Sequence, residues 1–375
     1  MNIVQIVEYL NRGAVERWLV EVFLLSRKMR PDLTWTFFCT LPIPGELEEV
    51  VRENGGKVVK ARASLNRVGS FLGELRALVR STRCEILHSH HDLISGLYLL
   101  GTLGLPIARR IVHVHNTSCS LPLRPGLKKR AYSQLCRMSC LRLADNIFGA
   151  SSAALAALCG KRRSESHRVL HCGIDLRRFA TAPEGIARIR SELRVDQGDK
   201  IVLFVGRLDE QKNPLFVLDV VSEMRRRHHG IRAVFVGNGP LLPEIIARAS
   251  RLRLDDYTHI LSWRKDVAEI MASADILLWP GLESQMEGLG LVSVEAQAAG
   301  LPILVSRNIP TEAFVVEQLC NVLPLSEGPP RWAALAASIL QRPRMSPGAC
   351  LSAVQRSSFA IENSARALLK AYVLW

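Results

Sequence analysis

Short aliphatic runs alternate with helical patterns along most of the chain. In the first half, amphipathic or Ala- and Leu-rich segments lie between most of these runs. Such a series of strands and helices predicts a parallel sheet covered by helices. The expected strands are 3–7, 34–39, 57–59, 86–88, 111–114, 147–149 and 169–171, and the expected helices are 15–28, 68–79, 127–143 and 152–158.

The series restarts after a segment of weaker pattern at 180–200, which is charged and rich in turn formers. A chain of 375 residues is too long for one typical core. The pattern predicts an α/β protein of two doubly wound domains, whose ligands bind at the carboxyl ends of the strands. The later strands are expected at 201–206, 233–237, 259–262, 275–280 and 302–306, a terminal helix at 359–375, and the domains at 1–180 and 181–356, followed by the segment 357–375.

The composition, with 48% hydrophobic and 22% charged residues, is that of a globular protein. The net charge is +14, and residues 101–180 hold 14 Lys or Arg against 3 acids. Basic surface of this kind suits nucleic acid, an anionic membrane or a phosphorylated substrate, and also ordinary solubility charge. No aromatic interleaving or nucleic-acid motif accompanies it, so we expect no nucleic-acid partner.

The nine cysteines are irregularly spaced and include no CxxC pair. This pattern argues against a disulfide framework and for a reducing cytosol, with Cys136 and Cys140 in the core. The start of the chain has an acid at Glu8 and no basic region or cleavage site, unlike a signal peptide. The longest uncharged run, 93–108, is broken by glycines and falls short of the roughly 20 residues of a spanning helix. It predicts a buried helix followed by a turn.

Candidate chemistry gathers where strands meet helices in the second half. The strand at 201–206 runs into GRLDEQKNP, where Asn213 and Pro214 suit a helix start. Arg207 and Lys212 then lie on a loop at the strand's carboxyl end. Two cations there would neutralise a diphosphate, although loop cations are often only solvated. The glycines of the next junction, VGNGPL, let a ligand approach the backbone or serve only a tight turn.

A third junction, SQMEGLGLVSVEAQAAGLPILVS at 284–306, carries Glu287 and Glu295 eight residues apart. A Gly-flanked turn entering a helix offers unpaired N–H groups and a positive dipole end, which favours phosphate. If the intervening residues were all helical, the two acids would be about 12 Å apart. That roughly matches the separation of ribose and sugar in a nucleotide sugar. The alternative is a helix-start acid and an exposed helix residue.

These motifs, in this order, resemble the donor-binding domain of retaining glycosyltransferases of family 4, which have the GT-B fold. In the first half, LNRGAVERWLVEVF resembles the family's Gly-rich first loop and helix, HVHNTS its acceptor-side histidine segment and CGIDLRRF its NGID…F linker. The resemblance covers residues 2–375 and is most similar to the exopolysaccharide and capsule branch. It implies two Rossmann-like domains facing across a cleft, with the C-terminal helix returning to the N-terminal domain.

The resemblance also implies roles for individual residues. Arg207 and Lys212, with the backbone N–H groups at 288–292, would hold the diphosphate, and Glu295 would bind the ribose hydroxyls. His115 and Glu287 are the implied catalytic residues beside the transferred sugar. The implied donor-binding residues are Gly13, Arg207, Lys212, Gly237, Asn238, Gly288, Leu289, Gly290, Leu291, Val292 and Glu295.

The implied reaction moves a sugar, with retention, from a nucleotide diphosphate sugar, UDP- or GDP-linked, to a hydroxyl of a saccharide or lipid-linked saccharide. In the family, the leaving phosphate is thought to help deprotonate that hydroxyl. Because the chain has no D-x-D motif, we expect no metal and no other cofactor. The basic segment 122–142 would contact an anionic membrane, which places the protein on the cytoplasmic face as a peripheral protein. Its exposed basic residues would be Lys128, Lys129, Arg137 and Arg142.

Three departures from the family pattern concern the site. The usual Gly-Gly of the first loop is Gly13-Ala14, which limits how closely the backbone approaches the donor. The usual Asn before Gly-Ile-Asp is Cys172, which puts that linker contact in question. The stretch GLESQMEG is longer than the family's loop before the first Glu, which reshapes the expected sugar pocket.

The sequence also admits other interpretations. A sugar-nucleotide epimerase would share the two-domain architecture and bind the same donor without an acceptor. A NAD-dependent enzyme is disfavoured because G-x-G-x-x-G is absent after the first strand. His88, His90 and His91 in LHSHHD lack a clear acidic or thiol partner, so no metal site is expected there. His113 alternates with His115 and should point to the same face of its strand.

Overall fold

The computed structural model describes residues 1–118, 126–160, 164–196 and 198–373. The chain divides into two compact units: unit 1 comprises Met1–Ile174 and Ile361–Trp375, and unit 2 comprises Asp175–Ala360. Each unit is built on one sheet whose paired strands are all parallel. The end of the chain therefore belongs to the first unit.

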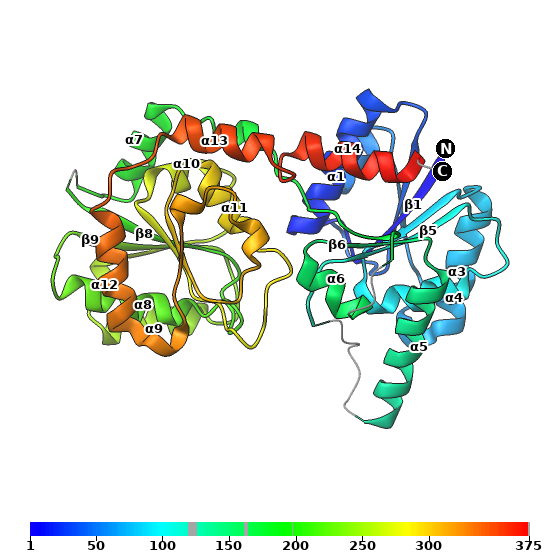
Figure 1. Ribbon diagram of the computed structural model, residues 1–375, viewed down its shortest axis with the longest axis horizontal. Helices are drawn as coiled ribbons and strands as arrows, with labels where there is room; N and C mark the ends of the chain where they lie inside the picture. The colour runs from blue at the N-terminus through cyan, green and yellow to red at the C-terminus, as the bar shows by residue number, and fades with distance from the viewer. Residues whose placement is uncertain (119–125, 161–163, 197, 374–375) are drawn as a thin grey trace. The chain divides into compact units, whose positions relative to one another are not determined.

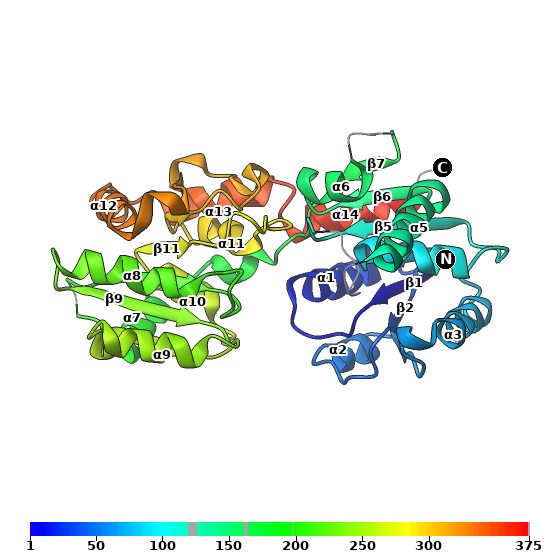
Figure 2. The same ribbon diagram turned by 90° about the horizontal axis from the view of Figure 1, so that it is seen from below.

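The strands of unit 1 are β1 (Asn2–Val7), β2 (Thr34–Cys39), β3 (Lys57–Lys60), β4 (Ile86–Ser89), β5 (Arg109–Val114), β6 (Asn146–Gly149) and β7 (His167–Val169). They form a sheet in the order β3-β2-β1-β4-β5-β6-β7, and Figure 2 shows this order from β2 through β1 and β5 to β6 and β7. The direction of winding reverses between β1 and β4, where α/β sheets bind ligands at the carboxyl ends of the strands.

The helices of unit 1 are α1 (Ala14–Met29), α2 (Glu48–Glu53), α3 (Val68–Ser81), α4 (Ser95–Gly101), α5 (Leu127–Leu143), α6 (Ser152–Cys159) and α14 (Ile361–Val373). In Figure 1, α1 and α14 lie on one face of the sheet and α3, α4 and α5 on the other. The expected buried helix in 93–108 is the short α4, followed by a turn.

The two faces of the central strands in unit 1 differ in chemistry, because successive side chains of a strand point to opposite faces. Toward α3, α4 and α5, Leu87 and Val112 join the apolar core cluster. Toward α1 and α14, the same sheet places Gln5, His88 and His113, all completely buried. One face is thus an ordinary apolar core, and the other is a buried polar layer.

The C-terminal helix α14 packs on α1, as the resemblance implies. The indole N–H of Trp18 in α1 donates to the Ser364 hydroxyl at 2.8 Å. That hydroxyl donates in turn to the His171 carbonyl at 2.6 Å. Near the end of the helix, Arg109 of β5 donates to the Ala371 carbonyl at 2.6 Å. The expectation that the last helix returns to the N-terminal domain is confirmed.

Helix α5 has the expected bounds but a different surface from the one expected. Leu127, Tyr132 and Leu135 are 82%, 51% and 49% exposed, so apolar side chains lie in the open beside the basic ones. Arg137 was expected on this basic surface, but its guanidinium donates to the carbonyls of Ala157 and Leu158 instead. Those carbonyls end α6, where a cation satisfies otherwise unpaired groups. Residues 122–125 of the expected segment lie outside the described residues.

The strands of unit 2 are β8 (Lys200–Val205), β9 (Ile231–Val236), β10 (Thr258–Leu261), β11 (Ile276–Trp279), β12 (Ile303–Val305) and β13 (Cys320–Val322), in the order β10-β9-β8-β11-β12-β13. The helices are α7 (Pro183–Glu192), α8 (Pro214–Arg225), α9 (Leu242–Arg251), α10 (Val267–Ser273), α11 (Leu291–Ala298), α12 (Gly328–Leu340) and α13 (Pro347–Arg356). Figure 1 shows the strands between α8, α9 and α12 on one side and α7, α10, α11 and α13 on the other.

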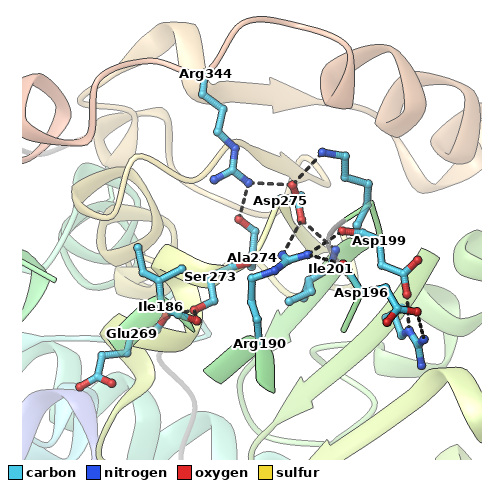
Figure 3. Close-up of polar contacts among 12 residues, drawn as sticks. Ile186, Arg190, Asp196, Asp199, Ile201, Glu269, Ser273, Ala274, Asp275 and Arg344 are labelled. Atoms are coloured by element: carbon cyan, nitrogen blue, oxygen red, sulfur yellow. Dashed lines mark hydrogen bonds and ion pairs between the residues drawn. The ribbon is translucent and has the colours of Figure 1, made fainter. Parts of the chain in front are cut away.

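A buried carboxylate ties the amino-terminal edge of this second sheet together (Figure 3). Asp275, 8% exposed, accepts hydrogen bonds from the Ile201 N–H at 2.9 Å, from Lys200 at 3.3 Å and from Arg344 at 2.8 Å. Arg190 of α7 completes the cluster at 3.7 Å. Strand β8, helix α7 and the segment between α12 and α13 therefore meet at one acid.

Every strand and helix expected from the sequence is present, but one strand is shifted and several elements were not expected, among them the short helix α2. The strand expected at 169–171 is β7 at His167–Val169. Strand β13 was not expected, and the weak-pattern segment contains α7. Among the described cysteines none is paired, and Cys136 and Cys140 are core residues as expected.

Candidate functional site

The junctions singled out in the sequence all lie at the carboxyl-terminal edge of the unit 2 sheet. Arg207 and Lys212 follow β8, Gly237 and Asn238 follow β9, and the loop bearing Glu287 follows β11. Parallel strands bring their carboxyl ends to one edge, so these loops become neighbours although they are far apart in sequence.

One side-chain contact and one backbone contact hold the β8 loop against the β11 loop. Asn213 is the N-cap residue of α8, as expected, but it adopts a left-handed conformation (φ 53°) and its side chain makes no cap hydrogen bond. Instead its amide donates to the Pro280 carbonyl at 3.1 Å. The Leu282 N–H donates to the Gln211 carbonyl at 2.9 Å. Lys212 is thereby placed beside the loop after β11.

Lys212 and Glu287 form an ion pair across these two loops. Their side chains are only 13% and 11% exposed, so water screens the pair far less than it would on an open surface. The ammonium also lies 4.8 Å from the centre of the Trp279 ring, a favourable cation–π distance. The sequence assigned these residues to different parts of a ligand, whereas the structure places them in direct contact.

Arg207 is in a different environment from Lys212. Its side chain is 66% exposed and pairs with Asp209 at 3.0 Å. Asp209 also accepts a hydrogen bond from the Lys212 backbone N–H at 3.0 Å. The exposed guanidinium is therefore free to move toward solvent without loss of a buried contact, since an exposed ion pair contributes little.

The glycine of the β9 junction serves the contact between two loops. Gly237 has φ 141°, and a Cβ atom there would collide with the Gly206 carbonyl oxygen. The Leu208 N–H donates to the Asn238 carbonyl at 3.0 Å, which joins the β8 and β9 loops. A larger residue at 237 would push the β9 loop away from the β8 loop, which carries both cations.

The segment with both glutamates is only partly helical. Gly290, left-handed at φ 79°, is the N-cap of α11, which begins at Leu291. Glu287 therefore lies on a loop and only Glu295 on the helix, so the separation expected from an all-helical segment does not apply. As the Gly-flanked pattern predicts, a loop leads into a helix here, and the N–H groups of Leu291 and Val292 belong to its first turn.

His115 lies at the carboxyl end of β5 in unit 1 and is 8% exposed. Its backbone N–H donates to a carboxylate oxygen of Asp92 at 2.6 Å, and the Asn116 side chain donates to the other oxygen at 2.7 Å. Its Nε2 is 3.0 Å from His90 Nδ1, and its Nδ1 is 3.7 Å from the Cys172 sulfur. Burial, and next the neighbouring histidines, lower the pKa of His115 well below its usual value.

Four imidazoles form one layer on this face of the sheet, from His88 and His90 near β4 and from His113 and His115 near β5. The rings of His113 and His115 stack at 4.3 Å, as their alternation predicts, and those of His88 and His90 lie at 4.2 Å. Trp18 of α1 contacts three of the rings edge-on. Burial lowers the pKa of all four histidines, because a charge here would be desolvated.

The histidines that could share an ion differ from those considered in the sequence. His88, His90 and His113 each offer a nitrogen within 4.8 Å of the others. His91, considered in place of His113, hydrogen-bonds through Nδ1 to the Tyr98 hydroxyl at 2.9 Å. Both nitrogens of His90 already have partners, on His115 and Gln5. By contrast, His88 Nε2 and His113 Nδ1 are buried without a hydrogen-bond partner among the described residues.

The departures from the family pattern have local explanations in unit 1. Gly13 is the N-cap of α1 with an ordinary φ of −60°, and Ala14 is the first helical residue. The Gly13 N–H is occupied by the Asn11 side chain at 2.7 Å. Cys172 is buried and faces His115, so the unusual residue keeps a contact with the candidate histidine.

Comparison with known proteins adds to this geometry. The profile of Glycosyltransferase Family 4 matches residues 7–178, and that of Glycosyl transferases group 1 matches residues 185–341. The D-inositol 3-phosphate glycosyltransferase of Segniliparus rotundus is 33% identical over 372 residues, which cover 94% of this chain and 80% of that protein. The chain belongs to glycosyltransferase family 4.

Further similarities agree with this glycosyltransferase family. EpsF of Bacillus subtilis (strain 168), which is named as a glycosyltransferase, is 27% identical over 343 residues, 90% of this chain and 87% of EpsF. Anabaena HepE, solved in complex with UDP-glucose, matches with a TM-score of 0.80 at 16% identity over 99% of both chains. The latter likeness shows the GT-B fold. The protein is a retaining, nucleotide-sugar-dependent glycosyltransferase.

Two further residues near these strand ends were not singled out in the sequence. Asp92, in a left-handed conformation (φ 46°), anchors the segment after His115, and its only sequence signal is its position just after a strand. Trp263 follows β10 at the edge that carries the cations, and its indole is 42% exposed. A Trp directly after an expected strand could have marked this position as a candidate for ligand binding. Among the described residues, no helix is long and apolar enough to cross a membrane.

Proposed function

We propose that this glycosyltransferase moves a sugar from a UDP- or GDP-linked donor to a hydroxyl of a saccharide or lipid-linked saccharide in surface polysaccharide synthesis, without a metal ion. The observation that carries the proposal is the shielded pair of Lys212 and Glu287 at the carboxyl edge of unit 2. A cation beside a helix start suits a diphosphate, and an acid beside that cation suits the sugar attached to it.

In this proposal the donor lies along the loops of that edge. Arg207, Lys212 and the N–H groups at 288–292 neutralise the diphosphate as it leaves, which is the stabilisation that a metal provides elsewhere. Glu287 contacts the transferred sugar, and Glu295 accepts hydrogen bonds from the ribose. The remaining donor residues are Gly13, Gly237 and Asn238.

Trp263 is a candidate for binding the nucleobase of the donor, for which the sequence analysis named no residue. Its exposed indole follows β10, the neighbour of β9, whose loop joins the cation loop. We infer that it stacks on the nucleobase, because an aromatic face binds any base and contributes on the order of 1–3 kcal/mol. Such stacking would accept either uracil or guanine, so the choice between them lies with other residues.

The exposed half of α5 supports an acceptor at a membrane. Leu127, Tyr132 and Leu135 are exposed there together with Lys128 and Arg130. Apolar side chains enter the interface of a bilayer while basic ones bind anionic headgroups, and the two effects add. We therefore propose that a lipid-linked saccharide is presented at that surface and that the protein binds peripherally to the cytoplasmic face.

We expect one class of nucleotide sugar to raise the melting temperature, since a ligand that binds only the folded state stabilises it. The same donor should be consumed, with sugar transferred to a saccharide acceptor, and turnover in excess chelator should stay within about twofold of the untreated rate. Thermal shift followed by a transfer assay with and without chelator measures both.

Two results would contradict this proposal. If chelator abolishes turnover and added metal restores it, the enzyme needs a metal ion. Arg207 and Lys212 would then not be sufficient to stabilise the leaving diphosphate. Inversion of the free nucleotide sugar in the absence of an acceptor would instead identify a sugar-nucleotide epimerase.

Binding to vesicles tests the membrane surface. The Lys128→Gln/Arg130→Gln variant should bind anionic vesicles about thirtyfold more weakly, because each basic residue near the surface contributes about 1 kcal/mol. Cosedimentation with vesicles of phosphatidylglycerol and phosphatidylcholine at low salt measures the affinity.

The matched control is Arg80→Gln/Arg83→Gln, which removes the same charge from exposed positions elsewhere in unit 1. Equal weakening by both variants would mean that only net charge matters. A wild-type protein that stays free of vesicles at low salt would refute the membrane proposal.

A further inference from the structure

A single carboxylate holds the loop after β5 to the loop after β4. One oxygen of Asp92 accepts hydrogen bonds from the backbone N–H groups of His115 at 2.6 Å and Asn116 at 3.3 Å. The other oxygen accepts a hydrogen bond from the side-chain amide of Asn116 at 2.7 Å. Strands β4 and β5 are neighbours in the sheet. Asp92 therefore ties their carboxyl ends together at the residue that carries the candidate catalytic imidazole.

Amide groups alone supply the hydrogen bonds to this carboxylate. Among the described residues, Asp92 forms no ion pair with a Lys, Arg or His side chain. Burial raises the pKa of Asp92, and the hydrogen bonds from Asn116 and His115 oppose that rise. Hydrogen bonds to a charged acceptor are roughly twice as strong as those between neutral groups. The three contacts therefore form a firm attachment, although no cation takes part.

The backbone of Asp92 is in a conformation that needs support. Its φ of 46° lies in the left-handed region, which residues other than glycine seldom adopt. Asp tolerates this region better than most residues because its short polar side chain can form local hydrogen bonds. Such strained positions persist only where the surroundings hold them, and they gather at functional sites. Here the hydrogen bonds to His115 and Asn116 provide that support.

The position of the β5 loop sets the surroundings of the His115 ring. Its Nε2 is 3.0 Å from Nδ1 of His90, which precedes Asp92 on the β4 loop. Its Nδ1 is 3.7 Å from the Cys172 sulfur, and a thiol is a weak hydrogen-bond donor. The ring also lies edge-on to Trp18, with ring centres 6.2 Å apart. A carboxylate takes part in none of these ring contacts, so the bond to Asp92 is the strongest link between His115 and the β4 loop.

We infer that Asp92 is a positioning residue, which fixes the His115 ring for the reaction by holding the backbone at 115–116. This inference rests on the proposed function, in which His115 lies beside the transferred sugar. Asp92 needs no contact with the substrate, because it acts through the loop that carries the ring. Catalysis depends on the orientation of the groups around the reacting atoms, so a small displacement of the ring lowers the rate.

The first test is Asp92→Asn, which keeps the size of the side chain and its tolerance of the left-handed backbone. The amide oxygen can still accept a hydrogen bond from the His115 N–H, but the charge is lost and an NH₂ group faces the Asn116 side chain. We expect kcat to fall about tenfold while donor KM stays within about twofold, because the change affects ring orientation and not donor binding. Steady-state kinetics at saturating acceptor measure both constants.

The matched control is Asp145→Asn at the other end of β5. Asp145 accepts a hydrogen bond from the Arg110 N–H at 2.7 Å, so it too holds the backbone of this strand through a carboxylate. Both variants should lower the melting temperature, but only Asp92→Asn should lower kcat per folded molecule. An equal fall in kcat for Asp145→Asn would mean that the effect is one of stability, and the inference would be overturned.

A second measurement needs no substrate. Ring signals in protein labelled with nitrogen-15 histidine report the surroundings of each imidazole, and a His115→Asn variant assigns those of His115. They should shift in Asp92→Asn and stay in place in Asp145→Asn. If Asp92→Asn does not fold, Asn116→Ala removes one of the three bonds and should shift the signals less, with kcat lowered about threefold. Unshifted His115 signals in the folded variant overturn the inference.

Failure of this inference can be told apart from failure of the proposed function. If the His115 signals shift but kcat and donor KM do not change, the ring moves without consequence and the positioning role is overturned. If no nucleotide sugar is turned over, the proposed function fails, and the spectra still decide whether Asp92 fixes the ring.

Discussion

Replacing Lys212 by Met should lower kcat/KM for the nucleotide sugar about a thousandfold, equivalent to about 4 kcal/mol. The substitution removes a cation from the diphosphate and also leaves the Glu287 carboxylate without its partner. The Glu287 side chain is only 11% exposed, so water screens its negative charge poorly. Without Lys212 this charge would repel the phosphate of the donor. Steady-state kinetics at fixed acceptor concentration measure the loss.

Arg207→Met is the control for loss of charge alone. Arg207 is 66% exposed and lies on the same loop, so its removal should cost only about tenfold. The double variant Lys212→Met/Glu287→Gln should lose less than the product of the two single effects, because the unpaired charge is gone. Equal losses for Lys212→Met and Arg207→Met would show that the pair with Glu287 has no special role.

Glu287→Gln and Glu295→Gln should affect different kinetic constants. Glu287 lies beside the proposed reacting sugar, where positive charge develops as the diphosphate leaves. Loss of one such electrostatic contact, worth about 3 kcal/mol, should lower kcat about a hundredfold with little change in donor KM. Glu295 on α11 would bind the ribose equally before and during reaction, so Glu295→Gln should raise donor KM and leave kcat largely intact.

Separate measurement of kcat and donor KM decides between these effects. The two variants are matched, since both change one carboxylate to an amide of the same size. If kcat and donor KM are unchanged in both variants, the segment with the two glutamates does not bind the donor. The proposed roles of Arg207 and Lys212 would then fail as well. If kcat falls only in Glu295→Gln, then Glu295 contacts the transferred sugar and Glu287 the ribose.

Most of the fold was predictable because its signals are local. Aliphatic runs and amphipathic segments recur at the spacing of a parallel α/β sheet, and even the bounds of α5 agree with the expected 127–143. The differences are the short helix α2 and others that were not expected, two strands at the sheet edges, and a helix in the polar linker. Strands β7 and β13 are edge strands of three residues each, too short for a periodic pattern. Helix α7 begins at Pro183 in a charged segment whose pattern was weak.

The sequence by itself determined which loops carry the candidate chemistry, because a residue that follows a strand in a parallel sheet lies at the carboxyl edge. Only the tertiary structure decided which side chains meet. Lys212 and Glu287 are 75 residues apart and come into contact because β8 and β11 are adjacent strands. The buried histidine layer and its link to Tyr372 likewise depend on α14 packing against the sheet from the far end of the chain. No local pattern encodes such contacts, since they arise from strand order and helix packing.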